Sequence, residues 1–187
     1  MNLFKTYYSY LNNPAQALSE IFAKRSVSVA IWGYFVAALS SVLFFNTGDS
    51  LSAPAFLGKL LILFAAEITC GFIAAAFCSL FLDLAKIKNS AAELFILVGL
   101  SGFIKGLFIA FALISAAFSF AKLGLLCPLA LLLVFCLQLI FLTRSVMCAY
   151  RANAGKALTA WIFTALPLGA VSVLLGIFFI WGILLIA

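Results

Sequence analysis

Long apolar stretches dominate the hydropathy pattern of the chain, and short polar segments separate them. An α-helix needs roughly 20 apolar residues to cross a bilayer core about 30 Å thick. Five stretches of about that length lie between charged or turn-forming segments, at residues 27–45, 59–82, 94–118, 125–143 and 159–186. The pattern therefore predicts an all-α fold, a polytopic bundle of five transmembrane helices.

The residues ahead of the first span predict short amphipathic helices. Asn13 followed by Pro14 is typical of a helix N-cap and first helical position. In the helix that would follow, Leu18, Ile21 and Phe22 share one face. We expect this face to lie along the cytoplasmic headgroups.

The polar segments between the apolar stretches are too short to hold a folded domain. The chain therefore divides into residues 1–26, which form a cytoplasmic interfacial segment, and residues 27–187, which form the transmembrane domain. Any functional site should lie among the spanning helices or at their ends.

Composition agrees with a membrane protein and excludes several kinds of site. Hydrophobic residues make up 67% of the chain and charged residues 9%, against about 45–50% and about 25% in soluble domains. The chain contains no histidine, which excludes Ser-His-Asp and Cys-His catalysis, histidine-ligated zinc or haem, and histidine pH switches.

The positive charges orient the chain. Eight Lys and Arg residues fall on one side of the predicted spans and two on the other. The first group is Lys5, Lys24, Arg25, Lys86, Lys88, Arg144, Arg151 and Lys156, and the second is Lys59 and Lys122. The positive-inside rule then places the N-terminus in the cytoplasm and the C-terminus outside, in an inner membrane of prokaryotic type. Because the cations are scattered, we expect them to contact anionic lipid headgroups and not nucleic acid.

Neither a cofactor nor a metal site is expected. The five cysteines form no CxxC pair, and most lie inside apolar stretches where Cys packs as a small hydrophobe. The two aspartates, Asp49 and Asp83, fall on opposite sides of the predicted membrane. We therefore predict that the protein is not an enzyme.

Two opposite charges lie within the predicted spans. Glu67 in the second and Lys105 in the third would each cost a few kcal/mol if left unpaired. Small residues share their faces, Cys70, Gly71, Ala74 and Cys78 beside Glu67, and Gly102, Gly106 and Ala110 beside Lys105. Because such stripes let helices approach closely, we expect the two charges to pair. The pair is then either a device that fixes helix register or a gate or binding point for an ion or lipid headgroup.

Two further polar residues complete the candidate intramembrane site. Gln138 lies midway along the fourth span, and Arg144 lies near its inner end. We interpret Gln138 as an interhelical hydrogen-bonding group and Arg144 as a headgroup anchor.

Three segments resemble the Yip-domain family, membrane proteins named for interaction with Ypt/Rab GTPases. They are Asn13-Pro14 with its following helix, the entry into the third span at residues 90–101, and the entry into the fifth at residues 155–167. The resemblance implies a non-enzymatic adaptor for membrane organisation or trafficking that binds membrane-protein partners, lipid or copies of itself. The third span departs from the family, because a proline expected near Ile104 is absent. The alternative function is a small transporter, channel or lipid-translocating protein that uses Glu67 and Lys105.

Overall fold

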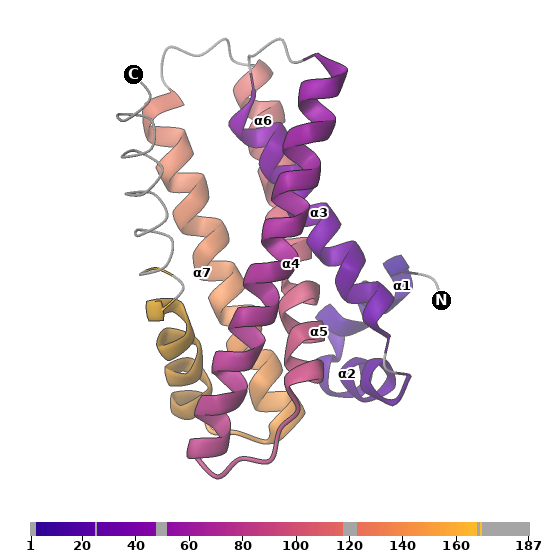
Figure 1. Cartoon of the computed structure of the whole chain (residues 1–187), viewed down its shortest axis with the longest axis vertical. Helices are drawn as coiled ribbons and strands as arrows, with labels where there is room; N and C mark the ends of the chain where they lie inside the picture. The colour runs from indigo at the N-terminus through magenta and orange to yellow at the C-terminus, as the bar shows by residue number, and fades with distance from the viewer. Residues whose placement is uncertain (1–2, 25, 48–51, 118–122, 168, 170–187) are drawn as a thin grey trace.

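The computed structural model describes residues 3–24, 26–47, 52–117, 123–167 and 169, and these residues are helical apart from short connections. The elements are α1 (Leu3–Asn12), α2 (Pro14–Ala23), α3 (Val27–Phe45), α4 (Ala53–Leu84), α5 (Ala91–Ser101), the 3₁₀ helix η1 (Gly102–Gly106), α6 (Leu107–Ala117) and α7 (Leu123–Tyr150). Residues 154–167 are also helical. The long helices run side by side, and α1 and α2 lie against one flank of this bundle (Figure 1).

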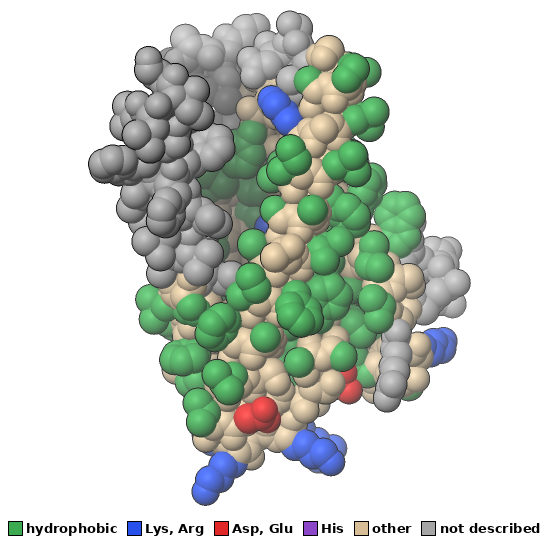
Figure 2. Space-filling view, in the orientation of Figure 1, with side chains coloured by type: hydrophobic (Ala, Val, Ile, Leu, Met, Phe, Trp, Pro, Cys, Tyr) green, Lys and Arg blue, Asp and Glu red, His purple; other side chains and the backbone are tan. Residues whose placement is uncertain are grey.

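Among the residues that the structure describes, four helical segments are long and apolar enough to cross a membrane. They are Val27–Phe45, Ala53–Leu84, Ala91–Ala116 and Cys127–Tyr150. Large apolar side chains are exposed along them, and Figure 2 shows hydrophobic side chains over much of the viewed face. A water-soluble surface rarely carries so broad an apolar area, so these faces suit lipid contact.

The predicted spans differ from the helices mainly at their ends. The second begins at Ala53 and not at residue 59, because Pro54 occupies the first turn, where its missing N–H would be unpaired anyway. Only the start of the fifth predicted span, residues 159–186, falls in the described helix at 154–167, and residues 168 and 170–186 lie outside the described residues.

The third span changes from α-helical to 3₁₀ geometry near its middle, which the sequence pattern did not predict. Its helix passes from α5 through the 3₁₀ segment η1 to α6, whereas hydropathy predicts one helix over residues 94–118. Gly102 and Gly106 bound η1, and glycine is about 1 kcal/mol less favourable than alanine in a helix. Lys105 is therefore carried by an irregular segment and not by a regular helix.

Close backbone contacts join α3 to the third span. A Cβ at Gly33 would collide with the carbonyl oxygen of Gly99, and one at Gly99 would lie 2.6 Å from the Cβ of Ala30. A Cβ at Gly102 would lie 2.6 Å from the Gly33 carbonyl oxygen. Three glycines thus allow two helices to touch backbone to backbone, as small residues do in membrane helix pairs.

The apolar core forms two clusters along the long axis. Three of the long segments contribute to both clusters, whereas α4 contributes buried residues to the larger cluster. The pairs are Tyr34 and Phe44 in α3, Leu100 and Ile104 in the third span, and Leu142 and Val134 in α7. The polar residues Ser101 and Gln138 lie between the members of two of these pairs and form a polar layer at the level where the clusters meet.

The apolar face of α2 packs against the bundle and not against lipid. Leu18 and Ile21 are each 1% exposed and belong to the larger cluster. The Tyr10 hydroxyl hydrogen-bonds Ser145 of α7, and burial raises the pKa of Tyr10 above its ordinary value. This differs from the predicted headgroup contact, because α7 supplies an apolar wall at this level.

Alpha helix α2 begins where the sequence predicts, although its cap is built differently. Asn13 is the N-cap residue and Pro14 opens the helix. The Asn13 side chain makes no capping bond to the backbone and instead donates from Nδ2 to Gln16 Oε1 at 3.3 Å. The proline and the buried face therefore contribute more to this helix than side-chain capping does.

Replacing Gly99 with alanine should destabilise the fold. The new methyl would overlap Ala30, so the unfolding free energy in detergent should fall by about 1–3 kcal/mol. Gly58→Ala on α4 is the matched control, because nothing lies within 4 Å of its Cβ position. Denaturant titration followed by circular dichroism measures both variants. Equal stability of Gly99→Ala and wild type would contradict the close α3–α5 contact.

Candidate functional site

Glu67 of α4 and Lys105 of η1 form an ion pair within the bundle. Lys105 Nζ donates to Glu67 Oε1 at 2.6 Å, and the two side chains retain 23% and 21% exposure, respectively. Both residues lie near the middle of helices long enough to span a membrane. The pairing expected from the sequence is therefore present, and the pair is not fully enclosed.

The small-residue stripes contact a different helix from the one expected. Gly102 of the third span packs against Gly33, and Gly71 of α4 packs against the Tyr34 ring, so both stripes face α3. The expectation that the stripes meet each other was wrong. Glu67 and Lys105 are brought together because α4 and the third span both pack on α3, and because α4 also packs directly on α5.

Gln138 extends the polar layer from α7 to the third span. Its Nε2 donates to Ser101 Oγ at 3.0 Å, and Ser101 Oγ in turn donates to the carbonyl oxygen of Val98 at 2.6 Å. This is the interhelical hydrogen bond that the sequence suggested. It joins α7 to the segment just ahead of Lys105.

A cavity of about 190 Å³ lies beside this polar layer. Its volume far exceeds the ~10–15 Å³ that one water needs by the same measure. The wall is mostly apolar and combines α3, α4, the third span, α7 and the helix at 154–167. It includes Tyr34, Glu67, Cys70, Gly71, Ala74, Val98, Gly102, Lys105, Phe135, Gln138, Leu139, Leu142, Trp161, Thr164 and Ala165.

Two aromatic residues with polar groups help to form the cavity wall. Tyr34 donates its hydroxyl hydrogen to the carbonyl oxygen of Phe95 at 3.0 Å. Trp161 is 4% exposed, and its indole N–H has no hydrogen-bond partner among the residues that the structure describes. A buried unpaired N–H is costly in an apolar medium, which makes Trp161 the least satisfied group in the wall.

Arg144 lies apart from the ion pair. It is exposed on α7 beside Tyr10, Pro14 and Phe141, where a smaller cavity of about 50 Å³ lies under the N-terminal helices. The structure thus brings Glu67, Lys105 and Gln138 to one cavity and leaves Arg144 with α1 and α2. Arg144 is positioned for the N-terminal helices and not for the polar layer.

The cavity contains the elements of a binding site and few of a catalytic one. Cys70 in its wall is a free thiol, as are the other four cysteines. Within the described parts of the chain, no three His, Cys, Asp or Glu residues gather as metal ligands do. The chemistry on offer is charge pairing, hydrogen bonding and apolar contact.

Sequence reasoning missed Tyr34, Phe135 and Trp161 as wall residues. Their aromatic side chains are indistinguishable in the pattern from those that face lipid. Three-dimensional packing, and not local pattern, selects these residues.

The four long apolar helices define a multi-pass integral membrane protein. No protein-family model, no curated protein and no solved structure matches the chain. Its function therefore has to be inferred from the cavity and the residues that form its wall.

A double-mutant cycle on Glu67 and Lys105 measures their coupling. Glu67→Gln leaves an uncompensated ammonium and Lys105→Met an uncompensated carboxylate, so each should lower the unfolding free energy by about 3 kcal/mol. The double variant should recover much of this loss, because no charge is then stranded. Denaturant titration in detergent gives all four free energies. Losses that add within about 0.5 kcal/mol would show that the two residues are independent.

Proposed function

We propose that the protein is a non-enzymatic carrier that binds a small polar or amphipathic molecule in the cavity beside Glu67 and Lys105 and moves it across the membrane. The observation that supports this function best is an accessible ion pair that lines a cavity near the middle of the bundle. Transporters commonly place their binding sites near the bilayer midplane.

The wall chemistry supports an amphipathic ligand. The cavity wall combines the ion pair and Gln138 with apolar surface from Phe135, Leu139 and Leu142 of α7. A polar group can therefore bind at the pair while an attached apolar part packs against α7. Ligand sites generally combine a mostly apolar wall with a few placed polar groups.

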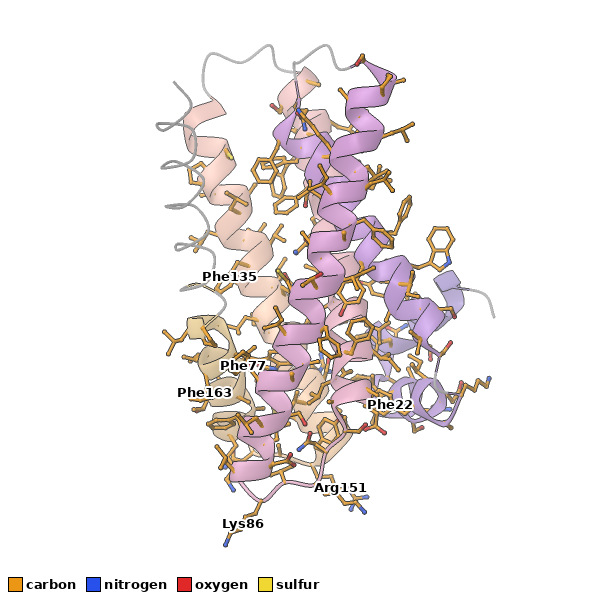
Figure 3. All side chains as sticks on the ribbon, in the orientation of Figure 1. Phe22, Phe77, Lys86, Phe135, Arg151 and Phe163 are labelled. Atoms are coloured by element: carbon orange, nitrogen blue, oxygen red, sulfur yellow. The ribbon has the colours of Figure 1, made fainter. Side chains whose placement is uncertain are left out.

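The proposed orientation places the loops at Lys86 and Arg151 in the cytoplasm of a prokaryotic-type inner membrane. Both side chains point away from the same end of the bundle (Figure 3). Lys59, near the start of α4, donates from Nζ to Asn46 Oδ1 at the end of α3. The count of cations on the two sides supports this orientation under the positive-inside rule.

An adaptor function of the Yip type is the second candidate. It is supported by α2, which fixes its apolar face to the bundle and exposes Gln16, Ser19 and Glu20 on the other side. Such a rigid polar face is suited to a protein partner. Capture of one partner by the wild type and not by Glu20→Lys would favour this function, whereas equal capture by both would count against it.

Filling the cavity should slow transport. In sealed vesicles, the reconstituted protein should accelerate either the transbilayer movement of acyl-chain-labelled phospholipids or the uptake of labelled glycerophosphoethanolamine, a solute that carries one positive and one negative charge. Ala165→Trp places an indole in the cavity and should reduce that rate about tenfold or more, which corresponds to about 1.4 kcal/mol.

Leu166→Trp is the matched control, because Leu166 is 69% exposed on the same helix and does not line the cavity. This variant should keep the wild-type rate. A wild-type protein that moves neither probe faster than protein-free vesicles would overturn the carrier function.

Cysteine labelling tests the orientation. In a cysteine-free background, Lys88→Cys and Ala154→Cys should react only after the membrane is permeabilised, whereas Thr47→Cys should react from outside in intact cells. Each position lies in or beside a connection between helices. External labelling at position 88 would reverse the orientation.

A further inference from the structure

The ion pair has unused hydrogen-bonding capacity at the cavity. An ammonium has three donors and a carboxylate has about four acceptor sites, but one hydrogen bond joins these groups in the described structure. Both residues also line the cavity and keep about a fifth of their side-chain surface accessible (23% and 21%). A ligand can therefore reach both charges from the same side.

Charge balance restricts which ligand can separate the pair. An anion that took Lys105 would leave the Glu67 carboxylate unpaired in a medium of low dielectric constant, and a cation that took Glu67 would strand Lys105. Leaving one buried charge unpaired costs several kcal/mol. A molecule that carries both charges avoids this penalty, because each protein charge exchanges one partner for another.

We propose that the ligand is a zwitterion with a primary ammonium and an oxyanion on a short linker. This inference rests on the proposed carrier function and names its substrate class. The ligand ammonium takes the place of Lys105 Nζ at Glu67, and its oxyanion, a phosphate or carboxylate, binds the released Lys105 ammonium. A primary ammonium suits the exchange because it donates hydrogen bonds as Lys105 does, which a quaternary ammonium cannot.

The local structure favours this exchange. The Gln138 Nε2 bond to Ser101 holds the residue that directly precedes η1, and Gly102 fixes the start of η1 against α3. Lys105 carries its ammonium on a flexible four-carbon side chain. The Lys105 ammonium can thus exchange partners while η1 and Glu67 of α4 stay in place.

The ligand has two possible sources with the same chemistry. One is the headgroup of an aminophospholipid, whose acyl chains would pack along Phe135 and Leu139. The other is a free solute such as glycerophosphoethanolamine, a phosphodiester that carries the same single negative and single positive charge. The cavity volume of about 190 Å³ has room for a headgroup of this size, so the source is left to experiment.

The test measures stabilisation of the full chain in non-ionic detergent. The probes are lysophosphatidylethanolamine, lysophosphatidylcholine and lysophosphatidylglycerol with the same acyl chain, together with glycerophosphoethanolamine. A ligand at about ten times its Kd should shift the folding equilibrium about tenfold. We expect this shift with lysophosphatidylethanolamine, with glycerophosphoethanolamine or with both, and a clearly smaller one with the choline and glycerol lipids.

The double variant Glu67→Gln with Lys105→Met is the control, because it removes both charges without stranding either. It should lose the shift, whereas Arg144→Gln, which alters a cation outside the cavity, should keep it. A shift with lysophosphatidylethanolamine alone identifies a lipid headgroup as the source, and one with glycerophosphoethanolamine alone identifies a free solute.

Two results would overturn the inference, and they differ in what they leave standing. In the first, all three lysolipids give equal shifts in the wild type, and these shifts are smaller in the double variant. The cavity would then bind ligands without preferring this zwitterion, so the carrier function would survive. Shifts that persist in the double variant, or no shift with any probe, would show that the ion pair binds none of these ligands, and the carrier function would then lose its main support.

Discussion

A charge in the hydrocarbon core of a bilayer has to be neutralised within the protein, and in this chain that constraint falls on Glu67 and Lys105. Their 2.6 Å ion pair fixes where α4 lies relative to η1. The two apolar clusters meet at this level, so the polar layer forms where neither cluster fills the bundle. The cavity is a consequence of the same arrangement, because charged side chains that pair across helices leave space beside them.

The pair in turn depends on the central helix α3. Gly33 brings the backbone of α3 against Gly99 and Gly102, and Gly71 accommodates the Tyr34 ring on the α4 side. Each contact is fixed by backbone geometry and rigid groups, which limits how far the helices can shift. Helix α3 thus helps to set the distance between the two charges without carrying a charge itself. The glycines matter for the site because they allow this close packing.

Sequence pattern predicts much of this structure wherever a property is local. The positions of the four described spans follow from hydropathy, and the Glu67–Lys105 pair follows from depth and the cost of burying charge. The 3₁₀ segment η1 could not be predicted in this way, because hydropathy averages over the residues whose backbone angles change. The helix that contacts the small-residue stripes was also predicted wrongly, because a stripe of small residues indicates close approach of a neighbouring helix but does not identify that helix. Trp161 entered the cavity wall through tertiary packing, which no local pattern encodes.

The accessibility of the pair distinguishes its two possible roles. An ion pair that serves only to fix register gains nothing from contact with a cavity, and well-packed apolar residues would often stabilise a buried position as well or better. Here each partner keeps about a fifth of its side chain accessible (23% and 21%), next to a space of about 190 Å³. That arrangement weakens the pair as a purely structural device. It is better accounted for by a pair that exchanges partners with a bound molecule, for which accessibility is a requirement.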